Sequence, residues 1–238
     1  MPYIGRLMIP YKRLLPIILI LFCTINCFAQ EIIETKSRLN DHVTESYYVL
    51  KAEPQIKSGA YQAFYKRKHL IAEGTYIDGK KIGIWNFYGT RGNLLERYNF
   101  NKDSLEYEAS VRLPSNFHYL IDKTITDSDW ITLPTRRGGR FYGFLPYINV
   151  FKASQAMYPG DEESSLATVE LLISPMGRLA SYKVHLIAPY QQNVTLSLNL
   201  FSEEQKKFIP ATFNHQPILS RIIIQCRVTN NGSLDFYY

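Results

Sequence analysis

Cysteine is scarce in this chain of 238 residues, and the few cysteines present exclude a disulfide scaffold. Two of the three, Cys23 and Cys27, lie in the N-terminal leader described below, which leaves Cys226 alone. One cysteine cannot form an internal disulfide, so a cysteine-rich fold is excluded. We expect Cys226 to lie on a buried strand face as a small apolar residue.

Sequence motifs of catalysis are also missing. The chain has no Gly-x-Ser-x-Gly nucleophile elbow, no phosphate-binding loop and no dinucleotide-binding fingerprint. Its five histidines are dispersed without the spacing of metal ligands. The dense acidic cluster Asp161-Glu162-Glu163 lacks the alternating acids of a calcium loop. We therefore predict that the protein is not an enzyme and uses no cofactor and no metal.

A strong excess of charge is missing once the leader is set aside. The formal net charge is +6, but Arg6, Lys12 and Arg13 belong to the leader, and without them 24 basic residues face 21 acidic ones. A nearly balanced chain gives no reason to propose a nucleic-acid partner. The 46% hydrophobic and 14% aromatic residues are typical of a folded chain rather than a disordered one.

Residues 1–29 have the pattern of a secretory signal peptide. Basic residues precede an apolar run from Leu14 to about Ile25, and small or permissive residues follow up to Ala29. The run is shorter than the roughly 20 residues that span a membrane comfortably, so we expect cleavage between Ala29 and Gln30. This predicts export to the periplasm or to the periphery of the outer membrane. The alternative is an uncleaved leader that anchors the protein in the inner membrane.

Residues 30–54 form a polar N-terminal segment, and residues 55–104 carry an internal repeat. We expect little order up to about His42 and a strand around Tyr47-Tyr48-Val49-Leu50. In the repeat, Gly59-Ala60-Tyr61-Gln62-Ala63-Phe64-Tyr65 returns as Gly83-Ile84-Trp85-Asn86-Phe87-Tyr88 after about 24 residues. Glycine-bounded turns separate these aromatic strands, and such hairpins must stack on one another to hide their aromatic faces.

The stretch from Gly74 to Trp85 resembles the MORN-type repeat, in the variant found in exported bacterial proteins. It places a Gly-x-Trp-x-x-Tyr motif after Asp78-Gly79-Lys80. The resemblance implies a recognition surface for a partner or a lipid headgroup. The alternative is that the aromatic residues Tyr61, Tyr65, Trp85 and Tyr88 are simply the core of a small β-meander. The basic run Lys66-Arg67-Lys68-His69 likewise has two interpretations, a solvated turn or a contact for anionic lipid.

Residues 105–130 carry no repeat and little periodicity, and their polar residues give them the character of a linker. We place a domain boundary there.

The following domain, residues 131–238, is organised around a hairpin. Apolar and polar residues alternate over 167–174 and over 180–186, on either side of the turn Ser174-Pro175-Met176-Gly177.

A third alternating stretch, residues 221–228, predicts a strand that returns to this hairpin. The segment between them is ambiguous, because residues 194–201 fit both helical and strand spacing. Ser202-Glu203-Glu204-Gln205 has the form of a capping box, which predicts a short helix that ends near Ile209-Pro210.

In their order along the chain, these features resemble the C-terminal domain of TonB-like proteins. Before the hairpin come a proline, paired glycines, a short helix and a Tyr-Pro pair; after it come an apolar segment, a polar turn and the last strand. The matching residues are Pro134, Gly138-Gly139, Phe144–Ile148, Tyr158-Pro159, Phe208-Ile209-Pro210-Ala211 and Asn214–Pro217. Residues 190–201 depart from the family, which has a cleaner amphipathic helix there.

The two resemblances together imply an α+β fold. We expect a MORN-like domain of β-hairpin repeats, followed by a small TonB-like domain with an antiparallel sheet and one or two helices. In the TonB family the C-terminal domain binds a short extended segment of an outer-membrane receptor, which adds to its sheet as a strand.

The resemblance therefore implies a protein-binding module in which the last strand, residues 220–228, is the candidate edge. Its outward residues Arg221, Ile223, Gln225 and Arg227 would contact the added segment. The alternative is an inner strand that pairs only within the fold.

The chain has neither a Pro-rich spacer nor a secure anchor, so we predict an exported adaptor of the cell envelope rather than an energy transducer. Its expected partner is a protein, with an outer-membrane receptor as one candidate. The alternative is a structural or surface protein of the envelope that binds lipid or peptidoglycan through its repeats. The C-terminal domain would then be a docking or dimerisation unit, so a homodimer is among the expected states.

Overall fold

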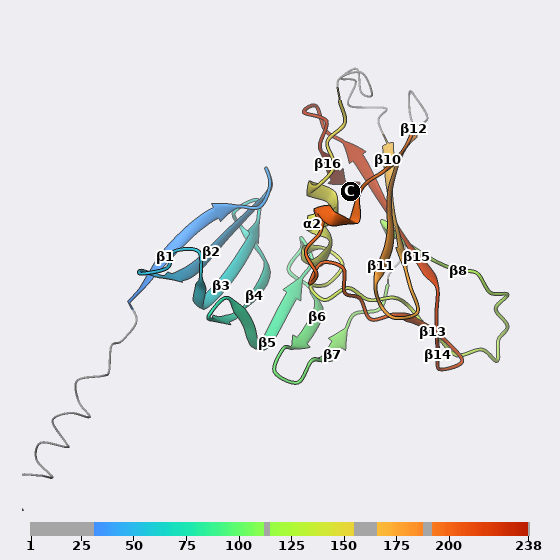
Figure 1. Ribbon diagram of the computed structural model, residues 1–238, viewed down its shortest axis with the longest axis horizontal. Coiled ribbons are helices and arrows are strands. Elements are labelled where there is room, and N and C mark those ends of the chain that lie inside the picture. The colour runs from blue at the N-terminus through green and yellow to red at the C-terminus, as the bar shows by residue number, and fades with distance from the viewer. Residues whose placement is uncertain (1–30, 112–114, 155–165, 188–191, 238) are drawn as a thin grey trace, which may run out of the picture.

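The computed structural model describes residues 31–111, 115–154, 166–187 and 192–237. The predicted signal peptide with Ala29 and Gln30, the Tyr158-Pro159 pair and the Asp161-Glu162-Glu163 cluster lie outside the described residues. The described strands form three antiparallel sheets. The first contains the N-terminal strands, and the other two contain the C-terminal ones (Figure 1).

The first sheet has seven strands, and each pairs with its neighbours in chain order. Loops of two to six residues join the strands. The shortest, Asp78-Gly79 between the fourth and fifth strands, has positive φ at both residues, as a two-residue type I′ hairpin turn requires. Residues 32–38, where we expected little order, form the first strand. The strands are β1 (Ile32–Arg38), β2 (Val43–Leu50), β3 (Lys57–Tyr65), β4 (His69–Ile77), β5 (Lys80–Tyr88), β6 (Leu94–Asn99) and β7 (Ser104–Glu108).

One face of this sheet forms its core. Residues opposite one another in register face the same side, so Glu45, Ala63, Ala72, Phe87 and Glu96 make one buried row across β2 to β6. In the next row the Trp85 indole packs directly on Gly74, where an added Cβ would lie 2.2 Å from the ring. Tyr61 and Trp85 of the aromatic repeat are therefore core residues.

The second sheet has six strands, and their order differs from the chain order. β15 lies between β10 on one side and β8 and β16 on the other, and β11 and β12 continue the sheet beyond β10. The predicted hairpin is confirmed, since the Gly177 amide donates to Ser174 O at 2.9 Å between its two strands. The strands are β8 (Phe117–Ile121), β10 (Leu166–Ile173), β11 (Leu179–Leu186), β12 (Gln192–Thr195), β15 (Ser220–Val228) and β16 (Leu234–Phe236).

The third sheet is a small one at the base of the second and contains β9 (Ile131–Thr132), β13 (Ala211–Phe213) and β14 (Gln216–Ile218). The one α-helix among the described residues, α2 (Leu145–Asn149), follows the 3-10 turn η2 (Tyr142–Phe144) where the TonB-like resemblance expects a short helix. A second 3-10 turn, η4 (Leu198–Leu200), follows β12. No helix in the described part of the chain is long and apolar enough to cross a membrane.

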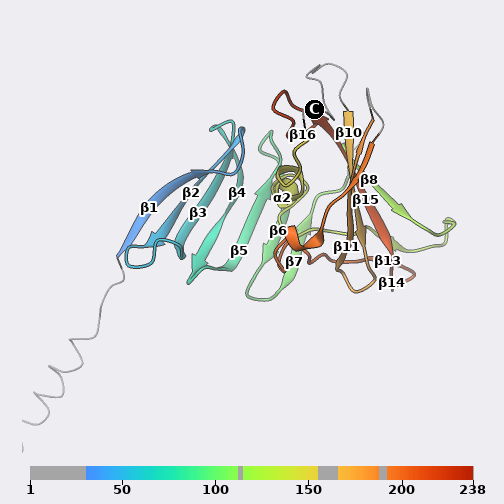
Figure 2. The same ribbon diagram turned by 45° about the horizontal axis from the view of Figure 1, so that its top comes forward.

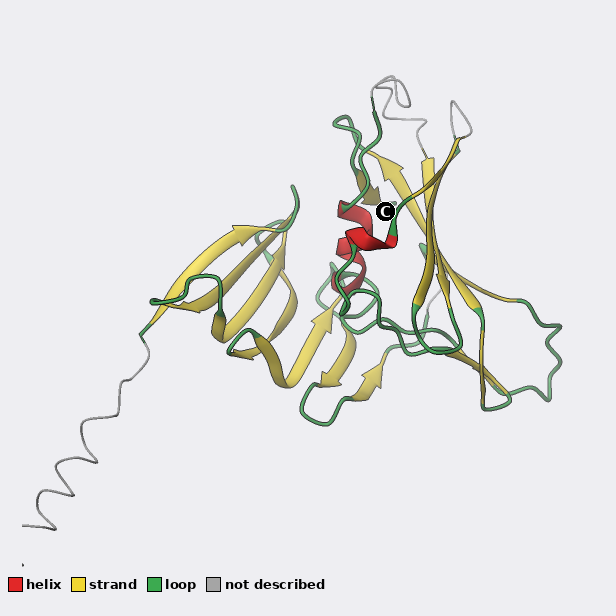
Figure 3. Cartoon of the chain, viewed as in Figure 1, coloured by secondary structure: helices red, strands yellow, loops and turns green. Residues whose placement is uncertain are grey.

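The predicted α+β fold is wrong, because the described residues are mostly in β-strands and form a single short α-helix (Figure 3). At the predicted helix near Ser202 the capping bonds do form, with Ser202 N donating to Gln205 Oε1 at 2.8 Å and Gln205 N donating to Ser202 Oγ at 3.2 Å. The backbone makes only a turn, because Phe208 N donates to Gly177 O and Ile209 pairs with Thr135. These tertiary bonds replace the next helical ones.

The segment η2–α2 lies between the two large sheets (Figures 1 and 2). Tyr142 stacks on Phe87 of the first sheet, and the Tyr182 hydroxyl of β11 donates to Tyr147 O at 2.6 Å. One continuous cluster of buried apolar residues runs through both sheets. In the predicted linker, residues 105–130, β7 completes the first sheet and β8 joins the second.

Candidate binding groove

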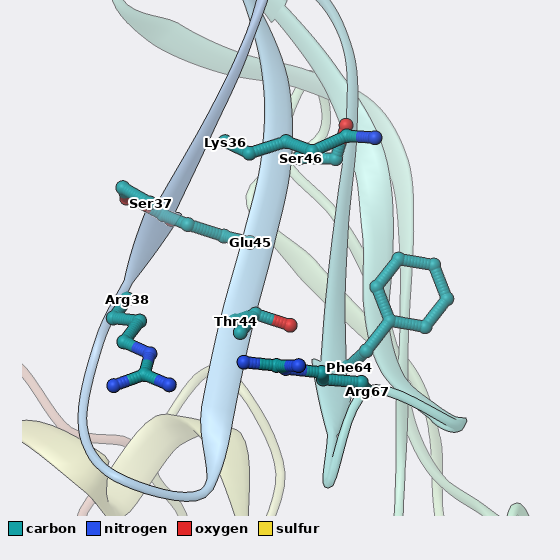
Figure 4. A pocket seen from close by; sticks show the side chains of 8 residues that line it. All are labelled: Lys36, Ser37, Arg38, Thr44, Glu45, Ser46, Phe64 and Arg67. Carbon is teal, nitrogen blue, oxygen red and sulfur yellow. The ribbon is translucent and has the colours of Figure 1, made fainter.

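An open groove of about 600 Å³ lies on the seven-stranded sheet near its β1 end (Figure 4). β1, β2, β3 and the turn after β3 supply its walls. Its lining residues are Lys36, Ser37, Arg38, Thr44, Glu45, Ser46, Phe64 and Arg67.

Strand register places most of these side chains on one face. Arg38 lies opposite Thr44, and Thr44 lies opposite Phe64, so these three residues form a row across β1, β2 and β3. Lys36 lies opposite Ser46 on the same face. Arg67 follows the end of β3, and Figure 4 shows its side chain directed across towards Thr44. On this face the groove combines three cationic groups with two hydroxyls and one aromatic wall, whereas the Ser37 and Glu45 side chains belong to the opposite face of the sheet.

The turn that carries Arg67 has an unusual backbone. Lys66 and Arg67 both have positive φ, at 48° and 59°, and Lys68 N donates to Tyr65 O at 3.1 Å. This is a type I′ turn, which Asn-Gly fits best, whereas a long L side chain in this conformation costs about 1–2 kcal/mol per residue. Lys66 and Arg67 are therefore less stable in this turn than Asn-Gly would be, although they place two basic residues at the end of the hairpin. Such strained positions cluster at functional sites.

The charges of the groove are only partly neutralised within the chain. The Lys36 ammonium lies 3.7 Å from Glu34, but both side chains are well exposed, so the pair is weak. Among the described residues, no carboxylate lies within ion-pairing distance of Arg38 or Arg67. Two guanidinium groups therefore remain available to an anion from outside, and their planar forks suit carboxylate and phosphate oxygens.

A buried polar network lies behind the groove, on the core face of the same strands. The Glu45 carboxylate accepts hydrogen bonds from Ser37 Oγ at 2.6 Å, from Lys57 Nζ at 3.0 Å and from the Tyr61 hydroxyl at 2.7 Å. The Tyr61 hydroxyl also lies 2.7 Å from that of Tyr142, and burial raises the pKa of Tyr61 far above its usual value. Because Lys57 neutralises it, Glu45 does not cancel the positive charge of the groove. The network also fixes β1 to β3 and connects them to η2.

The structure does not bring the predicted site residues to a free edge. β15 pairs with β10 on one side; on the other, residues 220–224 pair with β8 and residues 226–228 with β16. Between these two partners, Gln225 N donates to Asn116 O at 2.8 Å and Gln225 O accepts from Tyr237 N at 3.3 Å. The predicted edge is therefore an inner strand, and a partner could add there only by displacing β8 or β16.

The side chains of the predicted site are also occupied or dispersed. Arg221 bonds Asp122 at 2.9 Å, and Arg227 bonds Asp235 at 3.1 Å. Ile223 lies opposite His118 of β8. The Gln225 side chain lines a second groove of about 560 Å³ that runs between the two sheets.

The sequence alone identifies only some of the residues that line the first groove. The run Lys66-Arg67-Lys68-His69 stands out as basic, but its strained conformation is not encoded by any turn residue. Lys36 and Arg38 lie in a segment that looks loosely ordered, because an exposed end strand has no continuous apolar face.

Among the described residues, no three or more His, Cys, Asp or Glu side chains are placed to hold a metal ion. No family model, curated protein or solved structure matches the chain.

Proposed function

We propose that the protein is an exported binding module of the cell envelope that holds an anionic group in the groove of its seven-stranded sheet. The observation that carries the proposal is the placement of Arg38 and Arg67 in an open groove, without a carboxylate partner in the described chain. Lys36 adds a third cation, and the Thr44 hydroxyl adds a further hydrogen-bond donor, whereas the Ser46 hydroxyl already donates to Glu34 Oε1 at 2.8 Å.

Two kinds of partner present this anionic chemistry. The TonB-like resemblance leads us to a protein partner, with an outer-membrane receptor as one candidate, whose carboxylates would enter the groove. The MORN-like resemblance leads to a lipid or peptidoglycan component, whose phosphate or carboxylate groups would bind the same residues. The exposed basic turn, Lys66 to Lys68, favours a ligand that approaches from the end of the β3–β4 hairpin.

The proposal is tested by calorimetric titration of the protein with inorganic pyrophosphate as a probe anion. We expect binding by the wild type and a loss of affinity of about tenfold or more in the double variant Arg38→Gln/Arg67→Gln, since two charge-assisted contacts are removed. Lys80→Gln is the matched control, because Lys80 is an exposed cation on the same sheet outside the groove. Equal affinity in the wild type and the double variant would sink the proposal.

A second pair of titrations distinguishes the two kinds of partner. Phosphatidylglycerol vesicles represent a lipid surface, and a glutamate-rich peptide represents an acidic protein segment. The probe whose binding is weakened in the double variant identifies the class of partner.

Export is tested by the N-terminal mass of the protein recovered from cell envelopes. A chain starting at Gln30 supports a cleaved leader, whereas an intact leader in the inner membrane supports the anchored alternative.

A further inference from the structure

β1 is an end strand, and its outer side has no partner strand among the described residues. Two hydrogen bonds fix which backbone groups face outward. Lys51 N donates to Glu31 O and Leu39 N donates to Val43 O, so the odd-numbered residues of β1 bond to β2. The even-numbered residues therefore direct their N–H and C=O groups away from the sheet. These residues are Ile32, Glu34, Lys36 and Arg38.

The side-chain charges of these four residues are complementary to those of a second, antiparallel copy of β1. When two copies of β1 pair with Thr35 on the two-fold axis, Glu34 of each copy lies opposite Lys36 of the other, and Ile32 lies opposite Arg38. Shifting the register by two residues places either Glu34 opposite Glu34 or Lys36 opposite Lys36. Like charges directly opposite one another are destabilising, so the charges favour the register centred on Thr35 over these two neighbouring registers.

We propose that two copies of this chain associate through β1, which joins their seven-stranded sheets edge to edge. The pairing satisfies the outward backbone groups of both strands, which are otherwise bonded to water. It also covers Ile32 and Ile33, whose side chains are 45% and 44% exposed. The two Thr35 side chains meet at the axis as a non-hydrogen-bonded pair, an arrangement in which threonine pairs are favourable.

The dimer places two grooves on one continuous surface. The two-fold axis of an antiparallel edge pair is perpendicular to the sheet, so equivalent faces of both copies lie on the same side. The groove of Lys36, Arg38 and Arg67 is then repeated across the axis, and one ligand with two anionic groups can contact both copies. This inference concerns β1 alone and holds whether or not the groove binds an anion.

Sedimentation of the protein over a range of concentrations tests the pairing through its charges. Glu34→Lys and Lys36→Glu each place like charges opposite one another, so we expect each variant to dimerise about tenfold more weakly or worse. A mixture of the two variants restores opposite charges at both contacts and should form mixed dimers. The double variant Glu34→Lys/Lys36→Glu should likewise recover the wild-type affinity.

Disulfide trapping tests the register. Non-hydrogen-bonded residues of an antiparallel pair have Cα atoms about 4.5 Å apart, which a disulfide can span. Thr35→Cys should therefore give a covalent dimer on oxidation. Ile33→Cys is the control, because its equivalent in the second copy lies about 13 Å away along the strand. The wild type reports any cross-linking by the native cysteines.

Several outcomes would overturn the proposal. The first is a wild-type protein that stays monomeric at every concentration. This outcome includes a monomer in which another segment of the same chain pairs with β1 and protects its amides from hydrogen exchange. The second is a dimer that neither charge reversal weakens. The third is equal trapping of the Ile33→Cys and Thr35→Cys variants.

Discussion

The two large sheets follow the same alternation of apolar and polar residues, but they use their outward charges differently. In the six-stranded sheet, Arg221 and Arg227 of β15 are bonded to Asp122 and Asp235. In the seven-stranded sheet, Arg38 and Arg67 have no carboxylate partner among the described residues. The first arrangement makes charge part of the fold, whereas the second leaves charge available to a ligand.

Topology accounts for the difference. β15 returns late in the chain and inserts between β10 on one side and β8 and β16 on the other, so segments distant in sequence surround it. The seven-stranded sheet is a meander, in which each strand bonds only to its neighbours along the chain. Its end strand β1 therefore has one side without a partner strand among the described residues. The end strand of the meander is thus a better candidate binding site than β15, which lies inside its sheet.

The largest expected effect concerns the core of the seven-stranded sheet. Gly74→Ala places a Cβ within the Trp85 indole and should cost about 3 kcal/mol of unfolding free energy, since neither the ring nor the strand can move freely. Gly92→Ala is the control, because it meets no atom within 4 Å and strains only the backbone.

The measurement for Gly74→Ala is urea unfolding, followed at both sheets. Trp85 fluorescence in a Trp130→Phe background reports the first sheet, and thiol labelling of buried Cys226 reports the second. The continuous core predicts coincident transitions at both probes. Unfolding of the first sheet alone would show that the two sheets are independent units.

The next effect concerns the contact between the sheets and depends on pH. The buried Glu96 carboxylate accepts the Gly138 and Gly139 amides at 2.8 and 3.0 Å. Burial raises its pKa from 4.5 to about 7, an effect that Glu108 reinforces and that the two amides and Arg136 oppose. The folded protein thus keeps this proton to higher pH than the unfolded chain does. Stability should fall by about 2–3 kcal/mol as the pH rises from 4.5 to about 7.

Unfolding in urea at pH 5 and pH 8 measures this dependence. Glu96→Gln has no titratable group at this site, so most of the pH dependence should disappear in this variant. The part that remains is expected from Glu108, because burial raises the pKa of its carboxyl as well. An unchanged slope in Glu96→Gln would contradict the assignment.

A smaller effect separates stability from binding in the groove. Replacing Lys66-Arg67 by Asn-Gly provides the residues that a type I′ turn favours, so the protein should gain about 1–2 kcal/mol of stability. The same replacement removes one guanidinium from the groove, so pyrophosphate should bind more weakly. Thermal unfolding and calorimetry measure the two effects. A variant that gains stability and binds equally well would show that the strain serves another purpose.

The smallest effect is expected at the charges of β15. Arg221→Gln removes a partly exposed pair with Asp122 and should cost less than about 1 kcal/mol. It should leave pyrophosphate binding unchanged, because β15 contributes nothing to the groove. A large loss of binding in this variant, measured by the same titration, would instead place the anion-binding site on the six-stranded sheet.

Local patterns in the sequence predicted several of the strands, but not β1 or β8 and not how the strands pair. Alternation indicates β10, β11 and β15, and the aromatic repeat indicates β3 and β5, because each pattern depends on one strand alone. The position of β15 depends on pairing with β8, about 100 residues earlier, which no local pattern encodes.

The same limit explains the missed helix and groove. The capping box at Ser202 forms its bonds, but the bridge between Thr135 and Ile209 decides the backbone. The groove assembles residues from 36 to 67, and its strongest feature, positive φ at Lys66 and Arg67, contradicts local preference. A site that departs from local rules can be found only once the fold is known.

The most direct test of the proposed anion site is to map where an anion binds on the protein. Amide chemical shifts of the isotope-labelled protein are followed by NMR during titration with pyrophosphate. We expect shifts confined to the residues around Lys36, Arg38, Ser46 and Arg67 at the β1 end of the seven-stranded sheet. Shifts centred on Arg221 and Arg227 of β15, or no saturable shifts at all, would contradict it.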